Sequence, residues 1–483
     1  MNRQKLTVHL ALASLVILLA AIIGQVQRWE SKHDWVSVRV EKQQIERQQI
    51  ERMRRDAQRF EQTDTDEPEA LVRFKHGTSK ERIQAIAAKM GDRVEDEIES
   101  VGGLVAVDDL DGETVAQVVA GYDALPEVEY AEANEVIRVG PLNSSPLRSR
   151  FVSSVPAGGP NDPLLSDQWG LINTGQREGK SEADIGALAA WAKTHGSEKV
   201  VVAVLDSGVD YTHQDLVGNM WLRPADMEMY FDEQLGVVDD ANGFSAVDSV
   251  RDPMDENGHG THCAGIVGAE GDNGEGIAGV NWKIEIMPLK FMGKGGFGTT
   301  KDAIEAINYV IERKREGVNV RVISASWGSR QKSKALEDVI RKAGEAGILF
   351  VAASGNDSEN ADRTPHYPAN YQLPNIISVA ALDRRDQLAS FSNYGAKNVH
   401  VAAPGKEILS TWLDNKYEEH SGTSMATPFV AGVAGLVLSV EPNLSVKELR
   451  ERLLGSVDAL DALQGKVSSG GRINAARAVG ASR

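Results

Sequence analysis

The sequence predicts an α/β protein built on a doubly wound parallel sheet with helices on both of its faces. From residue 161 onward, short apolar runs typical of strands alternate with longer segments of helical periodicity. The run 199–206, Lys-Val-Val-Val-Ala-Val-Leu-Asp, is almost continuously apolar, which is typical of a strand buried on both faces. The expected strands after it are 284–289, 320–324, 348–353 and 376–381, and the expected helices are 300–315 and 332–345.

Length and composition limit the possible classes of function. A chain of 483 residues has room for two or three domains. Its net charge of −18 argues against non-specific nucleic-acid binding, so we expect no nucleic-acid partner. Cys263 is the only cysteine, which excludes a disulfide within the chain.

The first 28 residues have the features of a signal anchor or a signal peptide. Arg3 and Lys5 precede the apolar segment 6–26, which carries no Asp, Glu, Lys or Arg and is long enough to span a bilayer. No good small-x-small cleavage site ends this segment, so we favour an uncleaved anchor over a buried helix. The positive-inside rule then places the rest of the chain outside the cytoplasm, anchored to the membrane or secreted after processing. Residues 29–66 follow as a polar helical spacer.

Residues 67–139 are expected to form a small domain of their own, with the element order β-α-β-α-β. Its strands are predicted at 70–75, at 103–108 and from 128 onward, and its helices at 79–90 and 113–121. The segment 140–160 is rich in Pro, Ser and Gly and is predicted to be an exposed linker that is open to cleavage. The large α/β domain then comprises residues 161–483.

The segment from Ser421 to Gly432 predicts a tight turn that leads into a buried helix. Pro428 fits the first turn of such a helix, and the apolar run continues to Val440. Ser424 would then lie at a helix N-terminus, where free N–H groups stabilise an oxyanion. Such a turn is more often a simple N-cap, so a chemical role for Ser424 needs a base and a carboxylate from elsewhere.

Two upstream segments supply such groups. Asp206 ends the apolar run 199–206, and the C-terminal edge of a parallel sheet is where ligands gather, although a helix-capping Asp occurs there too. His259 lies between glycines at the start of a predicted helix. A metal site with His262 and Cys263 is not supported, because no second ligand cluster with zinc-like spacing follows.

Together these segments closely resemble the three signatures of the subtilisin-like serine proteases, in the family's order Asp, His, Ser. They are Asp206-Ser-Gly, His259-Gly-Thr-His and Gly422-Thr-Ser-Met-Ala-Thr-Pro428. The resemblance implies a subtilisin-like fold and a serine endopeptidase that hydrolyses polypeptides through an acyl-enzyme. It makes Ser424 the nucleophile, His259 the general base and then acid, and Asp206 the group that orients the imidazole. We expect a monomer.

The same resemblance assigns further residues. Asn356 matches the family's oxyanion-hole amide. Ser326, Trp327, Gly328 and Gly296 match segments that hold an extended peptide, although Trp327 replaces the usual leucine and could equally be a core residue. Residues 67–139 are similar to the family's N-terminal inhibitory propeptide, which would bind the enzyme as its own inhibitor.

A calcium site is also implied by the resemblance. Asp162, Asp215 and Asn273 match the side-chain ligands of thermitase-like members, and the carbonyl groups of Glu270, Glu275 and Ile277 complete the set. Cys263 is shared with the same members, and we expect it to be buried beside His259 without acting as a nucleophile.

Two other classes of function stay open at this point. The same fold could serve as a catalytically silent binder of peptides, although the intact set of chemical groups speaks against it. The same site could also transfer its acyl group to an amine, which would make the protein a peptide ligase; the mass of the products separates ligation from hydrolysis.

Overall fold

A nine-stranded sheet forms the centre of the computed structural model, which describes residues 69–139, 143–145, 158–232, 236–247 and 251–481. Eight neighbouring strands of this sheet pair in parallel, and only the last pair is antiparallel. The alternation of strands and helices therefore produced the predicted doubly wound sheet. In spatial order the strands are β10 (Phe244–Ser245), β11 (Lys283–Lys290), β7 (Gly196–Asp206), β13 (Val320–Ala325), β14 (Leu349–Ala353), β15 (Ile376–Leu382), β16 (Val401–Pro404), β20 (Gly471–Ile473) and β19 (Val457–Ala459).

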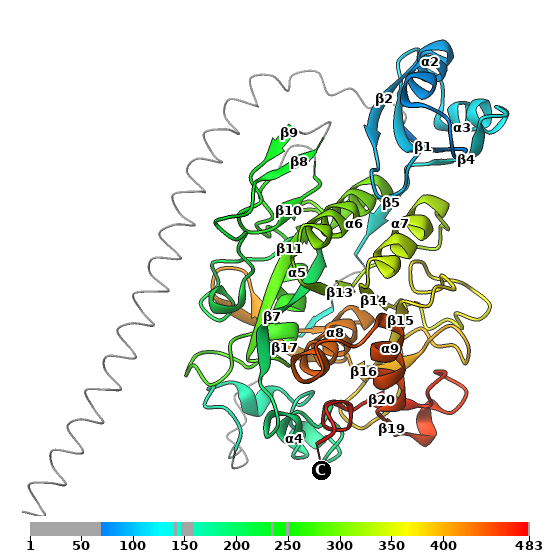
Figure 1. Cartoon of the computed structure of the whole chain (residues 1–483). Helices are drawn as coiled ribbons and strands as arrows, with labels where there is room; N and C mark the ends of the chain where they lie inside the picture. Colours follow the sequence, from blue (N-terminus) through cyan, green and yellow to red (C-terminus); the bar gives the residue numbers. More distant parts are fainter. Residues whose placement is uncertain (1–68, 140–142, 146–157, 233–235, 248–250, 482–483) are drawn as a thin grey trace, which may run out of the picture. The chain divides into compact units, whose positions relative to one another are not determined.

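Two hydrophobic cores cover the two faces of the sheet. Along β7, Val202 and Val204 belong to the core that contains α5 (His259–Gly268) and α8 (Thr423–Val440). The alternate residues Val201, Ala203 and Leu205 belong to the core that contains α6 (Thr300–Arg315) and α7 (Lys334–Glu345). Because strand side chains alternate between faces, an apolar residue at every position of β7 serves both cores. Figure 1 shows these helices on the two sides of the strands.

Helix α8 is the long buried helix predicted from the apolar run that ends at Val440. Among the residues that the structure describes, it is the one helix long and apolar enough to cross a membrane, but 89% of that stretch is buried inside the domain. The length and composition of α8 therefore reflect its place in the core. The apolar segment 6–26 and the spacer 29–66 lie outside the described residues.

The small N-terminal domain differs from its prediction by one strand. Its element order is β1 (Glu69–Phe74), α2 (Lys80–Met90), β2 (Asp92–Glu97), β3 (Leu104–Asp109), α3 (Val115–Asp123) and β4 (Val128–Ala133), with the spatial strand order β2-β3-β1-β4. The expected order β-α-β-α-β was wrong because β2, Asp-Arg-Val-Glu-Asp-Glu, carries five charged residues and no apolar alternation. Pairing with β3 and packing against the large domain hold this strand in place instead of sequence propensity.

The sheet of the small domain also has two apolar faces. Ala70 and Val72 of β1 pack toward its own helices, whereas Leu71 joins the core of α6 and α7 in the large domain. The second face of this small sheet is thus closed by the large domain, with α6 and α7 next to it (Figure 1).

After β4 the chain continues along the large domain. Strand β5 (Val136–Arg138) pairs with β12 (Phe297–Thr299), and β6 (Asn143–Ser145) pairs with β18 (Lys416–Ser421), both antiparallel. Most of the predicted linker, 140–142 and 146–157, lies outside the described residues. The remaining helices and strands are α4 (Ala187–Trp191), α9 (Val446–Gly455), α10 (Ala475–Ala478), β8 (Tyr230–Asp232), β9 (Gly236–Val238) and β17 (Ile408–Trp412).

Candidate active site

The acid and the histidine named from the sequence meet at the C-terminal edge of the central sheet. Asp206 is the last residue of β7, and His259 is the first residue of α5. His259 Nδ1 lies 2.6 Å from Asp206 Oδ1, and both side chains are buried. Gly260 allows this approach, because a Cβ atom at its position would lie 2.1 Å from the carbonyl oxygen of Gly208.

The charge environment of His259 favours its protonated form. Burial works against the imidazolium, but the charge and hydrogen bond of Asp206 and the charge of Asp255 outweigh it and raise the pKa of His259. The sequence reasoning did not include Asp255. A signal for it existed, since this acid stands four residues before His259 in a turn rich in Asn and Gly.

Ser424 is the second residue of α8 and lies beside α5. Its hydroxyl donates to the carbonyl oxygen of Ser326 at 2.9 Å, and the hydroxyl of Ser326 donates back to the carbonyl oxygen of Ser424 at 2.8 Å. In this arrangement the Ser424 hydroxyl must turn from Ser326 before it can donate to His259. Hydrogen bonds of this kind are often formed only when substrate is bound.

Pro428 lies deeper in α8 than the sequence predicted. The helix begins at Thr423, so Pro428 is in its second turn and not in the first. A residue there would normally donate its N–H to the carbonyl oxygen of Ser424, four residues earlier, and proline has no N–H. That oxygen accepts from Ser326 Oγ at 2.8 Å and from Cys263 Sγ at 3.5 Å instead.

Cys263 is buried next to the histidine and acid, as expected. Its Sγ and one ligand atom each of Asp206 and His259 lie within 4.8 Å of one another. Burial, as the largest effect, raises the pKa of this thiol well above its usual value, so it stays protonated near neutral pH. A protonated thiol is a poor nucleophile and a poor metal ligand, which agrees with an apolar packing role.

Asn356 is placed by the turn that follows β14. Its Oδ1 accepts from the Thr423 N–H at 2.8 Å and from the Thr423 hydroxyl at 3.0 Å, which leaves the amide Nδ2 to point the other way. A Cβ atom at Gly422 would lie 3.5 Å from both Asn356 Nδ2 and the Ser424 backbone nitrogen. The space that Gly422 leaves open is therefore flanked by two N–H donors, an arrangement suited to a developing oxyanion.

Of the residues expected to bind peptide, Trp327 lines a hollow that the small domain's tail also lines. The carbonyl oxygen of Gly296 accepts the Val139 N–H at 3.0 Å, and Trp327 is buried with its indole N–H donating to Leu205. Gly328 leaves no room for a side chain, because a Cβ atom would lie 2.4 Å from His366. The hollow holds about 70 Å³ and is lined by Trp327, Ser329, Leu336 and Tyr367 on one side and Glu132, Ala133, Glu135 and Ile137 on the other.

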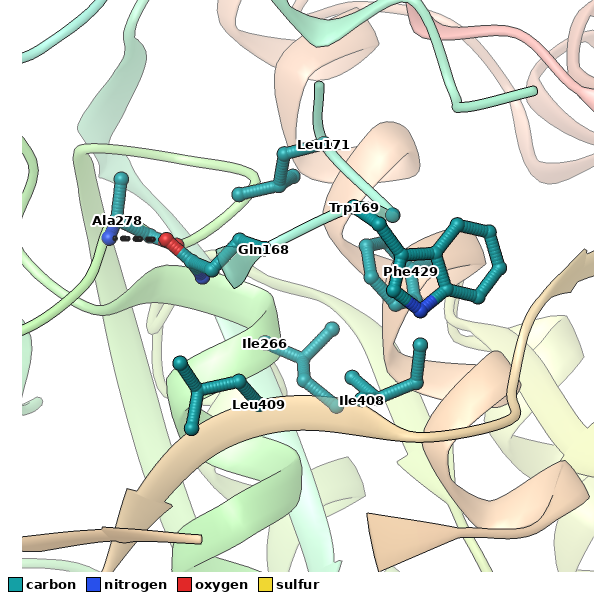
Figure 2. A pocket seen from close by; sticks show the side chains of 9 residues that line it. Gln168, Trp169, Leu171, Ile266, Ala278, Ile408, Leu409 and Phe429 are labelled. Carbon is teal, nitrogen blue, oxygen red and sulfur yellow. Dashed lines mark hydrogen bonds between the residues drawn. The ribbon is translucent and has the colours of Figure 1, made fainter. Parts of the chain in front are cut away.

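A second hollow, shown in Figure 2, lies in the core of α5 and α8. Gln168 closes it with its Oε1, which accepts the Ala278 N–H at 2.9 Å, while Trp169 and Phe429 lie on the opposite side. Its volume is only about 10 Å³, which is room for one water molecule at most. It cannot accept a peptide side chain. The hollow beside Trp327 is therefore the better candidate for binding a substrate side chain.

The predicted calcium ligands meet in one place. Asp215 accepts from the Ile277 N–H and from Asn273 Nδ2, each at 2.9 Å, and the Asp162 carboxylate accepts the Asp272 N–H at 2.9 Å. The amide nitrogen of Asn273, and not its oxygen, thus faces Asp215. Glu270 and Glu275 belong to the same loop: the Glu270 N–H donates to the Asp215 carbonyl, and the Glu275 N–H donates to Asn273 Oδ1, each at 2.8 Å.

Among the described residues, no cation is among the main influences on the pKa of Asp162 or of Asp215. Burial raises the pKa of Asp162 to about 6 and that of Asp215 to about 7, and the strongest charge acting on each is another carboxylate, Asp272 and Asp162 respectively. Asp162 Oδ1 is buried without a hydrogen-bond partner. Two buried carboxylates of this kind fit a hard cation held by oxygen ligands.

Comparison with known proteins identifies similar sequences for both domains. A model of the subtilase family matches residues 197–476, and a model of the fervidolysin N-terminal prodomain matches residues 67–134. The chain is 34% identical over 421 residues to the "Thermophilic serine proteinase" of Bacillus sp. (strain AK1), covering 85% of this chain and 87% of that protein. It is 36% identical over 321 residues to "Thermitase" of Thermoactinomyces vulgaris, covering 66% and 99%. It is also 38% identical over 250 residues to "Subtilisin-like protease 2" of Plasmodium falciparum (isolate 3D7), but spans only 17% of that protein.

Proposed function

This chain belongs to the subtilase family, as a thermitase-like serine endopeptidase with an N-terminal propeptide, and we propose that Asp206, His259 and Ser424 carry out its reaction. The observation that carries this proposal is the buried pair of His259 and Asp206, whose Nδ1 and Oδ1 atoms are 2.6 Å apart. Asp206 ends β7, and His259 begins α5, the helix that packs against the one that bears Ser424. Its substrates are polypeptides, and it is made as a precursor with its own inhibitor.

In the proposed reaction Ser424 attacks the carbonyl carbon of a peptide bond. His259 takes the proton from the Ser424 hydroxyl as the bond from Oγ to carbon forms, and it then gives this proton to the leaving nitrogen as the peptide bond breaks. Water repeats the sequence on the acyl-enzyme and regenerates Ser424. The carboxylate of Asp206 holds Nδ1 and stabilises the imidazolium, which agrees with the raised pKa of His259.

Asn356 and the Ser424 backbone N–H would bind the oxyanion. The bond from Thr423 to Asn356 Oδ1 supports this role, since it fixes the amide so that Nδ2 stays available. Replacement of such a donor costs about 10²- to 10³-fold in kcat in enzymes of this type.

Residues 67–139 are proposed to be the inhibitory propeptide, with the catalytic domain at 161–483 after the linker 140–160. The pairing of β5 with β12 supports inhibition, because the tail occupies the edge that would accept a substrate strand. Ile137 borders the hollow beside Trp327 as a substrate side chain would.

Contacts on both sides of residues 140–142 support a narrower proposal for the processing site. Val139 still pairs with Gly296 on one side, and Asn143 pairs with Ser421, three residues before Ser424, on the other. We therefore place the self-cleaved bond between Val139 and Asn143, which gives a mature enzyme that begins at residue 140, 141, 142 or 143.

Calcium is proposed to stabilise the catalytic domain. Asp162 and Asp215 would hold the ion, with Asn273 and the carbonyl groups of Glu270, Glu275 and Ile277. The partnerless Asp162 Oδ1 and the raised pKa values of both acids support this assignment. The ion would neutralise two buried charges and take no part in the peptide-bond chemistry.

We also propose that residues 1–28 anchor the precursor in a membrane, with residues 29–66 as a spacer, and that the catalytic domain works outside the cytoplasm as a monomer. The apolar segment 6–26 and its preceding Arg3 and Lys5 support the anchor. Cleavage between Val139 and Asn143 would release the enzyme from it.

The test is to express the wild-type chain and Ser424→Ala side by side and to size and sequence the products. The proposal expects the wild type to separate into a propeptide fragment and an active enzyme whose N-terminus lies at residue 140–143. Ser424→Ala should remain at full length and fold. A wild-type chain that hydrolyses casein without being cut would overturn the processing scheme.

A further inference from the structure

The turn that presents His259 is organised by one buried carboxylate. Asp255 accepts five hydrogen bonds, all from groups near the histidine. Its Oδ1 accepts from the N–H groups of Asn257 and Gly258 at 2.9 and 3.0 Å and from Ser207 Oγ at 2.9 Å. Its Oδ2 accepts from the Thr261 N–H at 3.0 Å and from the Thr261 hydroxyl at 2.7 Å.

Through Ser207 the same carboxylate reaches the acid of the reacting pair. Ser207 follows Asp206 directly and donates its own N–H to Asp206 Oδ1 at 2.8 Å. Its hydroxyl donates to Asp255 and accepts the Gly260 N–H, next to His259, at 3.0 Å. The end of β7 and the start of α5 are therefore joined by a closed set of bonds with Asp255 and Ser207 at its centre.

From this geometry we infer that Asp255 is a positioning residue for His259, which both fixes the His259–Asp206 contact and supplies a second negative charge to the imidazolium. The inference rests on the proposed function, since it presumes that His259 is the base. Asp255 is only 4% exposed, so its charge acts on the imidazole with little screening by water. Its five hydrogen bonds tie together Ser207, the turn before His259 and the first turn of α5.

The other charged and titratable groups around His259 do not replace Asp255. His262 and His420 lie nearby, and burial, as the largest effect, lowers the pKa of each, so both are neutral near pH 7. A cation, Lys290, also lies at this edge, where its Nζ donates to the Ser207 carbonyl oxygen at 2.9 Å. Asp206 and Asp255 are the two negative groups that raise the pKa of His259.

The central test is Asp255→Asn in the enzyme released from the full chain. The amide keeps the size of the side chain but loses its charge and turns an N–H₂ group toward backbone donors. We expect kcat to fall by about 10- to 100-fold, the range typical of a group that orients a reacting residue, with little change in KM. The acid limb of the kcat/KM profile should move to lower pH by about half a unit to one unit, because the lost charge had favoured the protonated histidine.

Asp252→Asn is the matched control. Asp252 is a buried acid of the same segment that accepts from the Tyr211 hydroxyl and the Met254 N–H, each at 3.0 Å. The Asp252→Asn variant should leave the acid limb of the kcat/KM profile at the same pH as in the wild type. If Asp255→Asn left the acid limb unmoved, or if both variants moved it equally, the inference would be wrong.

A second variant keeps the test decisive if Asp255→Asn does not fold. Ser207→Ala removes the hydroxyl that links Asp255 to Gly260 but keeps both charges, so kcat should fall by about 3- to 10-fold with an unchanged acid limb. A Ser207→Ala enzyme with wild-type kcat would overturn the inference.

Failure of the proposed function would look different. The imidazole of His259 can be titrated by NMR in full-length Ser424→Ala, which does not depend on turnover. A lower pKa of His259 in Asp255→Asn/Ser424→Ala would support the role of Asp255 even if the released enzyme proved inactive on the chosen substrate. An unchanged pKa would contradict it.

Discussion

The backbone of Ser424 is held in place through its own carbonyl group, which Pro428 leaves without an intrahelical donor. Because Pro428 donates no hydrogen bond, the Ser424 carbonyl is available to Ser326 Oγ and Cys263 Sγ, which come from a strand end and from the helix of His259. The nucleophile's backbone is thus tied to two other parts of the site. An ordinary residue at position 428 would add its own N–H as a competing donor to the same carbonyl oxygen.

Cys263→Ala tests which of these two ties matters. The thiol is the weaker donor, at 3.5 Å, and the hydroxyl of Ser326 remains at 2.8 Å, so kcat/KM should stay within about threefold of wild type. The lost sulfur leaves a small cavity that costs about 1 kcal/mol of stability. Peptide hydrolysis and thermal unfolding measure the two effects. Complete loss of hydrolysis in a folded Cys263→Ala protein would show that the thiol takes part in the chemistry.

Candidate catalytic residues could be named from the sequence where they stand in a recognisable motif. Residues that hold them in place could not. Asp206, His259, Ser424 and Asn356 could be named from the sequence because their segments pair a reactive side chain with glycines at a strand or helix end. Asp255 was missed, although it stands four residues before His259, because its link to Asp206 runs through Ser207, which is 48 residues away in sequence. The position of Pro428 was wrong by one turn because the turn Ser421–Gly422 is shorter than expected.

Among the elements, the loop from Glu270 to Ile277 is the one that we expect to be stabilised by the proposed calcium ion. It brings its own groups against Asp215 and Asp162, whose buried charges repel each other in the absence of a cation.

Removal of calcium should therefore lower the melting temperature of the released enzyme. An ion present at 100 times its dissociation constant contributes about 2.7 kcal/mol, which corresponds to several degrees. Differential scanning calorimetry with calcium or with EGTA measures the effect, and Asp215→Asn should remove most of the difference. Equal melting temperatures with and without EGTA would speak against the site.

Strand β2 shows where element prediction from sequence fails. Five strands of the central sheet, β7, β11, β13, β14 and β15, were predicted because each is largely apolar on both faces. The strands nearer the two edges, β10, β16, β20 and β19, were not predicted, and β2 is charged at five of six positions. Its Asp96 is buried only because α6 of the large domain covers it. Tertiary contacts, which the local sequence does not record, decide such a strand.

At the scale of the whole molecule, the interface between the two domains contains a pair of acids. Asp96 of β2 and Glu305 of α6 are 6% and 7% exposed, and each lies close enough to act on the other. Burial, as the largest effect, raises the pKa of both. The charge of Asp96 raises the pKa of Glu305 further, whereas the hydrogen bond with Glu305 works to lower that of Asp96. Around them lie Asp232, Glu99 and the ion pair of Lys301 with Glu95, whose Nζ and Oε2 are 2.6 Å apart.

We expect this pair to make release of the proposed propeptide depend on pH. The complex holds a proton that the separated domains release, so binding is strongest at low pH and weakens as the pH rises through the pKa range of the paired acids. After self-processing, the fraction of the propeptide that co-elutes with the enzyme in size-exclusion chromatography should fall from pH 5 to pH 8. Glu305→Gln should flatten this dependence, since the amide is neutral at every pH.

Asp338→Asn is the control for this prediction. Asp338 accepts from the Tyr130 hydroxyl at 2.9 Å across the same interface. Its loss should weaken co-elution to a similar extent at every pH. Release that grows as the pH falls, or that follows the same pH course in Glu305→Gln, would contradict the role of the acid pair.

The central claim is that Ser424 is the nucleophile of a serine endopeptidase. The most direct measurement is peptide mapping by mass spectrometry after treatment of the released, casein-hydrolysing enzyme with a fluorophosphonate. We expect one adduct, on the peptide that contains Ser424. Casein hydrolysis should fall in proportion to labelling and be lost entirely when labelling is complete. An enzyme that loses activity with its adduct on another residue, or that carries the Ser424 adduct and still hydrolyses casein, would contradict it.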